Sequence, residues 1–238
     1  MSAAVRLFCL PYAGGSARIF QDWRDDLPDF VDVRPLELPG RGLRFSEPPQ
    51  DRLETVVTDL LETVSAEDDL PLAIFGYSYG ALLGFELAWR LERRRGTGPV
   101  CLIVAAARAP IWPGPLNRLG DLPDAQLLEG LRLMNGTPRE LLEHRQLMEI
   151  MLPVVRADFT AAERYQYRPG PLPSCPITAF CGTDDPVVSR TSMEAWAECT
   201  ASDFALHELP GDHFFLRSAR EPLLRRLART LSSLSEVS

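Results

Sequence analysis

The sequence predicts an α/β fold in which a mostly parallel central sheet is flanked by helices. Short apolar segments typical of buried strands alternate with segments of helical periodicity, which is the order expected of a parallel sheet. One strand joins one helix through a tight glycine–serine–glycine turn at 76–80, and residues 111–170 interrupt the alternation without a strand signal. The chain has 238 residues, 45% of them hydrophobic, so we expect one core and a single domain over 1–238.

The alternation begins with an apolar strand at 5–10. The segment 16–27 is expected to be a helix, because Phe20 and Trp23 lie at helical spacing and serine at position 16 favours the N-cap. The next segments repeat the pattern, with strands at 31–38, 72–75 and 100–107 and helices at 53–64 and 81–95. After the interruption, two more strands and an amphipathic helix complete the core, at 176–181, 204–209 and 222–234.

The interruption at 111–170 contains three helical patterns, at 124–134, 138–151 and 158–165, separated by prolines. An insertion of this size between two core strands is most simply a helical lid over the functional site. The alternative is a set of helices that merely packs on the core.

The segment 72–80 reads Leu-Ala-Ile-Phe-Gly-Tyr-Ser-Tyr-Gly and carries the most chemical information. A strand, the motif G-x-S-x-G and a helix in direct succession form the nucleophile elbow of the α/β-hydrolase fold. The turn holds its serine in a strained conformation above the sheet edge, and glycines at 76 and 80 leave room for the crossing strand and helix. We therefore predict Ser78 as a nucleophile. The alternative is a plain Gly-Ser turn.

A serine hydroxyl needs a base near neutral pH, and histidine is the usual one. The chain has three. His144 lies in a charged helical run, which is typical of a solvated helix face, and His207 lies within the last predicted strand. His213 follows that strand, at the sheet edge where parallel α/β proteins place their active sites. The sequence therefore predicts His213 as the base.

The third member of a hydrolase triad is expected after the strand at 176–181, where Asp184 and Asp185 compete. The spacing of strand, glycine and aspartate common in α/β-hydrolases selects Asp185, counted from Gly182. The alternative role for Asp184 is that of a turn residue bonded to nearby backbone. The resulting order of serine, aspartate and histidine is that of the α/β-hydrolases.

An acyl-transfer site also needs backbone donors for an oxyanion. One is expected from Tyr79, the residue after the nucleophile, and the second from the loop 11–16 that follows the first strand. That loop contains Gly14 and Gly15, which allow a close approach of the backbone to a ligand. The second donor is then Tyr12 or Ala13.

The composition of the chain limits which partners, cofactors and cellular locations are expected. A net charge of −8 argues against nucleic acid and against an anionic membrane surface. Five cysteines without a C-x-x-C spacing are expected to be structural thiols rather than disulfides or a metal site. No apolar stretch has the length of a membrane span, and no signal-peptide pattern is present, so we expect a soluble cytoplasmic protein. No metal or cofactor is expected.

Several motifs together resemble one family, the type II (external, editing) thioesterases that accompany polyketide synthases and nonribosomal peptide synthetases. They lie at 10–16, 39–42, 108–110, 135–138, 152–153, 156–159, 165–167, 182–185 and 213–216. The resemblance implies a thioester hydrolase that acts on acyl groups carried by the phosphopantetheine arm of an acyl or peptidyl carrier protein (ACP or PCP). It also selects Ala13 as the second oxyanion donor.

The chain departs from this family pattern at three positions. Tyr77 and Tyr79 replace a histidine and a methionine or leucine, and Asp212 replaces a glycine. We expect the two tyrosines to make the entrance to the site bulkier and more polar. Methionines of the insertion are expected to form an adaptable apolar acyl pocket, with ordinary core packing as the alternative. The full set expected to bind substrate is Tyr12, Tyr77, Met134, Met148, Met151 and Phe214.

The predicted function is hydrolysis of carrier-bound acyl thioesters, which releases stalled or mis-primed acyl groups. The alternatives are a generic carboxylesterase, a dedicated chain-releasing thioesterase, and a non-catalytic binding protein of hydrolase fold. Carrier proteins are acidic, and so is this chain, so docking needs a local basic patch. The candidates near the active-site loops are Arg18, Arg24, Arg41 and Arg44, each of which has a solvated surface role as its alternative.

Overall fold

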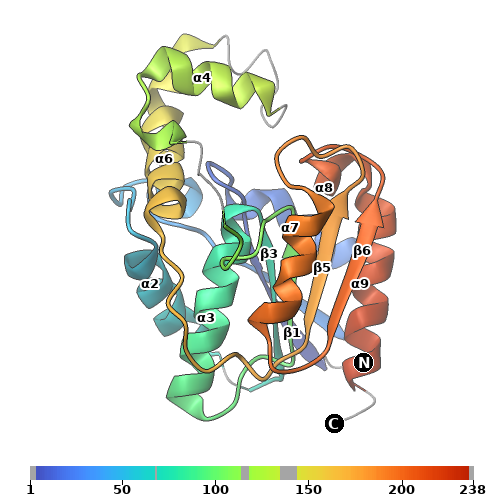
Figure 1. Cartoon of the computed structure of the whole chain (residues 1–238). Helices are drawn as coiled ribbons and strands as arrows, with labels where there is room; N and C mark the ends of the chain where they lie inside the picture. Colours follow the sequence, from blue (N-terminus) through green and yellow to red (C-terminus); the bar gives the residue numbers. More distant parts are fainter. Residues whose placement is uncertain (1–3, 68, 114–117, 135–143, 236–238) are drawn as a thin grey trace.

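The computed structural model describes residues 4–67, 69–113, 118–134 and 144–235. Its centre is a parallel sheet in the order β2-β1-β3-β4-β5-β6, covered by helices on both faces (Figure 1). This confirms the predicted fold class. The strands are β1 (Val5–Leu10), β2 (Val31–Pro35), β3 (Leu72–Tyr77), β4 (Cys101–Ala105), β5 (Ile177–Gly182) and β6 (Phe204–Leu209).

Two apolar clusters hold the helices against the sheet. In β1, Phe8 and Leu10 face one cluster with α2 (Leu53–Ser65) and α3 (Tyr79–Arg95), while Leu7 and Cys9 face the other with α9 (Arg220–Ser235). This strand is buried along its whole length, because both of its faces are covered. The other helical segments outside the insertion are α1 (Trp23–Asp26), α7 (Arg190–Glu194), α8 (Phe215–Ser218), η1 (Ala17–Phe20), η2 (Gly42–Arg44) and η4 (Ala195–Cys199).

The helix expected at 16–27 is wrong in detail, because η1 and α1 take its place. Ser16 makes no side-chain capping bond, and short helices without caps are marginal. The aromatic residues of this segment are nevertheless buried, as expected of the predicted helix. The ring centroids of Phe20 and Trp23 lie 4.9 Å apart.

The segment between β4 and β5 contains η3 (Leu119–Asp121), α4 (Asp124–Leu133) and α6 (Arg145–Arg164). The two helices expected at 138–151 and 158–165 differ from the structure, because α6 runs through Pro153 as one helix. Residues 138–143 of the first lie outside the described residues. Figure 1 shows α4 standing above the sheet, with α6 descending from it toward α3. Leu127 and Leu131 of α4 pack against Met148 and Leu152 of α6.

The five cysteines are all buried and free. Burial raises the pKa of the Cys9 thiol well above its usual range. These are the properties of structural thiols. In the part of the chain that the structure describes, no helix combines the length and apolarity that a bilayer crossing requires.

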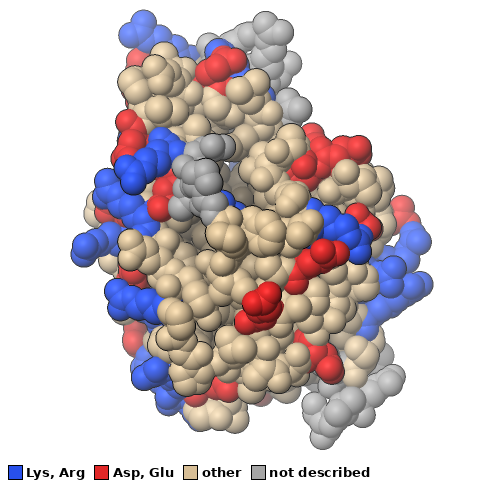
Figure 2. All heavy atoms as spheres, in the orientation of Figure 1, with Lys and Arg blue, Asp and Glu red and all other residues tan. Residues whose placement is uncertain are grey.

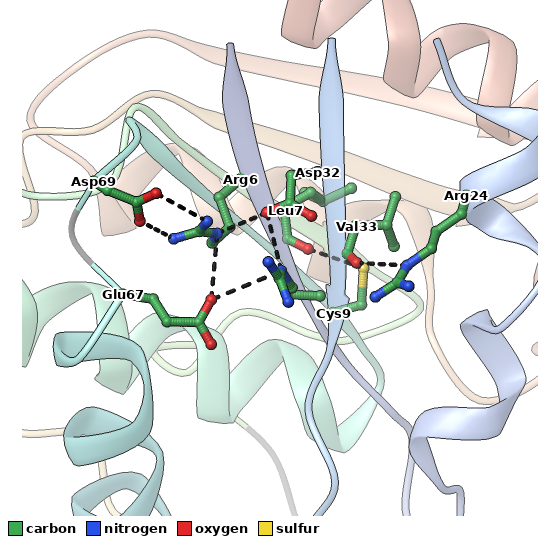
Figure 3. Close-up of polar contacts among 9 residues, drawn as sticks. Arg6, Leu7, Cys9, Arg24, Asp32, Val33, Glu67 and Asp69 are labelled. Atoms are coloured by element: carbon green, nitrogen blue, oxygen red, sulfur yellow. Dashed lines mark hydrogen bonds and ion pairs between the residues drawn. The ribbon is translucent and has the colours of Figure 1, made fainter. Parts of the chain in front are cut away.

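An ionic network joins the amino-terminal ends of β1 and β2 to the segment before β3 (Figure 3). Arg6 of β1 is 5% exposed, and its guanidinium lies 2.9 Å from Asp32, 2.5 Å from Asp69 and 3.3 Å from Glu67. Arg34 also bonds Asp32, at 2.9 Å. Burial favours a raised pKa for Asp32, but the hydrogen bonds from the two arginines outweigh it and hold the pKa below its usual value. The network therefore satisfies a charge that burial in β1 would otherwise leave unpaired.

We predict that Arg6→Met, which keeps the apolar stem, lowers the free energy of unfolding at pH 7 by about 1–3 kcal/mol, because Asp32 loses its partly buried donor. The folded-state pKa of Asp32 is depressed, so its stabilisation is present above its unfolded pKa and is lost as the pH falls through the folded value. The deficit of the variant therefore shrinks in acid. Urea unfolding between pH 7 and pH 3 measures both effects.

The matched control is Arg94→Met, which removes an ion pair to Glu62 in which both side chains are exposed. It is expected to cost less than Arg6→Met, because water screens the attraction between two exposed charges. An Arg6→Met deficit no larger than that of the control, or one that does not change with pH, would contradict a stabilising role for the network.

Candidate active site

The turn between β3 and α3 places Ser78 at the carboxyl edge of the sheet. Ser78 has φ 54° and ψ −113°, and its N–H donates to the carbonyl of Ala105 on β4 at 2.8 Å. A β-carbon on Gly76 would lie 2.2 Å from the Gly80 carbonyl oxygen, and one on Gly80 would lie 2.3 Å from that of Leu10. Both positions therefore require glycine. The backbone strain at Ser78 exposes its hydroxyl to the cavity above the sheet.

Three strand ends bring together the residues predicted as a triad. His213 Nε2 lies 3.2 Å from Ser78 Oγ, and His213 Nδ1 lies 2.8 Å from Asp185 Oδ2. The second carboxylate oxygen, Oδ1, accepts the N–H groups of Val187 and Val188 at 2.8 and 3.0 Å. The Asp185 carboxylate is thus fixed on both oxygens, and it orients a histidine that is 4% exposed.

The residues that competed for these positions lie elsewhere. His207 is on β6, where its ring is tilted against that of Phe180 with the centroids 5.4 Å apart, and burial lowers its pKa. His144 is the N-cap of α6 and accepts the N–H of Leu147, so it is more than a solvated helix residue. Asp184 accepts a hydrogen bond from the Thr183 hydroxyl at 2.9 Å, as a turn residue does.

Tyr77 does not line the entrance to the site, and that expectation is wrong. Its side chain is fully buried. Its hydroxyl donates to the carbonyl oxygen of His213 at 2.7 Å and accepts the N–H of Leu216 at 3.2 Å. Burial and the nearby carboxylates raise the pKa of this phenol well above its usual range, so it stays protonated. Tyr77 therefore ties the histidine loop to the strand that carries the nucleophile.

A cavity of about 220 Å³ adjoins Ser78 and His213, and a smaller one of about 90 Å³ shares both residues. Of the residues expected to bind substrate, Met134, Tyr12 and Phe214 line these cavities. Met148 and Met151 line neither of these two cavities, contrary to the expectation. Met148 is buried in the apolar cluster between α4 and α6, and Met151 packs against that cluster.

Several lining residues were missed from the sequence. Phe159, Ala162 and Glu163 share one face of α6 by their helical spacing, which was the available signal once 158–165 was read as helical. Leu82 follows the nucleophile by one helical turn. The remaining lining residues follow β4 and β5 or belong to η3: Ala106, Ala107, Arg108, Leu119, Val187 and Val188.

Besides His213, the mostly apolar cavity wall includes one acidic and one basic side chain, Glu163 and Arg108. Burial raises the pKa of Glu163, although its carboxylate accepts the N–H groups of Leu119 and Gly120 at 2.6 and 3.1 Å. Burial lowers the pKa of Arg108. A substrate group at this wall therefore meets both an apolar surface and oriented charge.

The loop after β1 reaches the same cavities through Tyr12 and Ala13. The N–H of Gly14 donates to Asp158 Oδ2 at 2.7 Å, and that of Gly15 donates to the Tyr12 carbonyl at 2.8 Å. Both glycine amides are thus engaged. Among the described residues, the amides of Tyr12 and Ala13 have no such partner. Tyr79 is the first residue of α3, where an N–H has no intrahelical acceptor.

The four arginines expected as a docking patch do not form one. Arg41 is only 7% exposed, which overturns its expected surface role, and Arg44 is bound to Glu47 and Asp59 at 2.5 Å each. Arg18 and Arg24 are exposed. Figure 2 shows the molecule from the same side as Figure 1. The centre of this face is largely uncharged, arginines lie along its margins, and a hollow lies beneath the lobe that carries α4.

A parallel α/β sheet that presents a serine at a strained turn, backed by an aligned histidine and aspartate, defines the serine hydrolases of the α/β-hydrolase fold. Comparison with known proteins narrows this class. The family described as Thioesterase domain matches residues 5–231, so the chain belongs to the thioesterase family and is a hydrolase of thioesters. The family resemblance of its motifs is thereby confirmed.

Individual proteins of known name are similar to this chain over nearly its whole length. The linear gramicidin dehydrogenase LgrE of Brevibacillus parabrevis is 42% identical over 97% of this chain and 89% of its own. The gramicidin S biosynthesis protein GrsT of Aneurinibacillus migulanus is 39% identical over 97% of this chain and 90% of its own. The type II thioesterase BorB from the borrelidin biosynthetic cluster has a TM-score of 0.88 and 37% identity, covering 96% of this chain and 94% of its own. The name of LgrE denotes a different chemistry, and the match over 5–231 decides the family.

We predict that Tyr77→Phe lowers the free energy of unfolding by about 1–3 kcal/mol, because the His213 carbonyl and the Leu216 amide lose a buried partner. It should also reduce kcat, since the loop that holds the imidazole is released. Thermal unfolding and acyl-thioester turnover of the same preparation measure the two effects. Unchanged values for both would show that the hydroxyl does not anchor the loop.

Proposed function

We propose that this thioesterase hydrolyses acyl groups from the phosphopantetheine arm of a carrier protein, with Ser78, His213 and Asp185 as its catalytic triad. The observation that carries the catalytic assignment is the hydrogen-bonded chain of 3.2 and 2.8 Å between the three side chains. The proposal for the carrier rests on BorB and GrsT, which their names place in biosynthetic systems. By the same analogy, the enzyme releases stalled or mis-primed acyl groups in the cytoplasm.

In the first half of the reaction, His213 Nε2 takes the proton of Ser78 as Oγ attacks the thioester carbonyl. The carbonyl oxygen becomes an oxyanion, which the N–H groups of Tyr79 and Ala13 stabilise. The tetrahedral intermediate collapses with cleavage of the carbon–sulfur bond, and the imidazolium returns its proton to the departing pantetheine thiolate. Asp185 holds the imidazole in one tautomer and stabilises its charged form.

In the second half, a water molecule enters the place of the thiol. His213 removes its proton while the hydroxide oxygen attacks the acyl-serine carbonyl. The second tetrahedral intermediate collapses with cleavage of the ester bond to Ser78, and the histidine proton passes to Oγ. The products are the free acid and the original serine.

The insertion that contains α4 and α6 acts in this proposal as a lid. Its contribution to the cavity wall supports that role, because Met134, Phe159, Ala162 and Glu163 all come from it. A wall built from the insertion encloses the acyl group and limits access of water until the acyl-enzyme has formed.

Ser78→Ala is expected to reduce thioester turnover by about 10⁴–10⁶-fold with an unchanged melting temperature, because only the nucleophile is lost. Hydrolysis of acyl-coenzyme A, followed by release of the thiol, measures it. Ser202→Ala, on an exposed loop, is the matched control. Near-normal turnover by purified Ser78→Ala would refute the catalytic assignment.

The proposed substrate class is tested with a carrier protein loaded separately with acetyl, a longer acyl and an aminoacyl group. Mass spectrometry of the carrier follows deacylation, beside the matching coenzyme A thioesters and a p-nitrophenyl ester. We expect faster loss from the carrier than from coenzyme A, since the carrier adds contacts outside the cavity. Cleavage of the simple ester alone would replace this proposal by a generic esterase.

A further inference from the structure

The helix α6 reaches past the cavity to the loop after β1. Asp158 of this helix is 2% exposed, and its Oδ2 accepts the N–H of Gly14 at 2.7 Å. Gly14 has φ 76° and lies so close to α6 that an added β-carbon would stand 2.6 Å from Val155 Cγ2. The insertion therefore contacts the loop by close packing as well as by a hydrogen bond from a buried carboxylate.

Arg41, which follows β2, completes the arrangement. Its guanidinium forms a two-pronged ion pair with Asp158, at 2.5 Å to Oδ2 and 2.8 Å to Oδ1. The same guanidinium donates to the carbonyl oxygens of Gly15 at 3.2 Å and Pro39 at 3.3 Å. Three segments distant in sequence, the loops after β1 and β2 and the middle of α6, thus meet at one buried ion pair.

This ion pair fixes one particular turn. The Gly14 N–H is held by Asp158, the Gly15 carbonyl is held by Arg41, and the Gly15 N–H closes onto Tyr12. A turn with two consecutive glycines has little stiffness of its own. With these groups anchored, Ala13 is held at the cavity that it lines together with Ser78 and His213.

Charge explains why both partners are needed. A lone carboxylate next to this loop would oppose the negative charge that develops on the substrate carbonyl oxygen. The guanidinium neutralises it, so the pair supplies a strong acceptor for Gly14 without a net charge. Preorganised donors of this kind act mainly in the transition state.

We propose that Asp158 and Arg41 are positioning residues, which hold the loop after β1 so that the Ala13 N–H points at the oxyanion. The inference rests on the proposed function of Ser78 and Ala13. It assigns to the helical insertion a part in catalysis besides enclosing the substrate, because the anchoring carboxylate belongs to α6.

The test compares three variants with the wild type. Asp158→Asn keeps an oxygen acceptor for Gly14 but loses the charge that holds Arg41. Removal of one partner of a buried pair is strongly destabilising, whereas replacement of both by apolar residues is often tolerated. The double variant Arg41→Met/Asp158→Leu is therefore the decisive one. Arg164→Gln is the matched control, since Arg164 joins the same helix to Asp51 of the core at 3.5 Å, with both side chains exposed.

The measurements are kcat and KM for an acyl-coenzyme A and a p-nitrophenyl ester, and the inhibition constant of an alkylboronic acid. A boronic acid adds to the serine hydroxyl, which loses its proton, and forms an anionic tetrahedral boronate that places one of its hydroxyl oxygens where the oxyanion forms. For the double variant we expect kcat to fall by about 10–100-fold, with KM changed by less than about twofold. The inhibition constant should rise by the same factor as kcat/KM falls. Asp158→Asn should lie in between, and Arg164→Gln should match the wild type.

A folded double variant whose kcat stays within about threefold of the wild type overturns the inference, because loss of an oxyanion donor costs more than that. So does a loss of kcat with unchanged boronate inhibition, which places the effect outside the oxyanion site. Failure of the proposed function has a different signature. Absent thioester turnover by the wild type would contradict the proposed substrate class, and the ester and boronate comparisons would then still test the loop. Turnover that survives Ser78→Ala would contradict the catalytic assignment itself and with it the premise of this inference.

Discussion

The close contact between two glycines and the neighbouring backbone at Ser78 is the constraint on which the rest of the structure depends. Gly76 lets α3 approach β3, and Gly80 lets α3 approach the end of β1, each at a separation that a single methyl group would prevent. The crossing forces Ser78 into a backbone conformation that costs energy, and the surrounding sheet holds it there. The parallel order of β3, β5 and β6 then brings the loops with Asp185 and His213 to the same edge. The three residues proposed as nucleophile, base and acid therefore lie together because β3, β5 and β6 run parallel in one sheet.

The sequence predicts much of this, because motifs at strand ends are local. G-x-S-x-G fixes Ser78 within five residues, and the strand signals before Asp185 and His213 place both at the correct edge. What it does not reveal are contacts between side chains and distant backbone. The Tyr77 hydroxyl meets the His213 carbonyl 136 residues away, and Asp158 meets the Gly14 amide 144 residues away. No periodicity records such pairs, so Tyr77 was wrongly expected at the entrance and Arg41 on the surface.

The insertion shows the same limit in its apolar residues. Helical spacing predicted α4 and part of α6, but it does not tell which face meets the other helix and which meets the cavity. Met148 is buried between the two helices, whereas Met134 and Phe159 contact the same cluster and also line the cavity beside Ser78. Both environments favour the same residue types, so the spacing alone does not separate them. Nor does the spacing show that α6 continues through Pro153.

The twenty-residue length of α6 has a consequence for how such enzymes are recombined. One end of the helix packs with α4, its middle holds the loop after β1, and its last turns form the cavity wall. A graft that exchanges the whole insertion between relatives would transfer a new acyl cavity and, with it, a new partner for Gly14 and Arg41. Recipient chains whose loops lack a matching arginine would acquire the donor's selectivity on a slower catalytic frame. Chimeras that keep the recipient's sequence through Asp158, and take only the following turns of α6 from the donor, retain the recipient's own contacts among Gly14, Arg41 and Asp158.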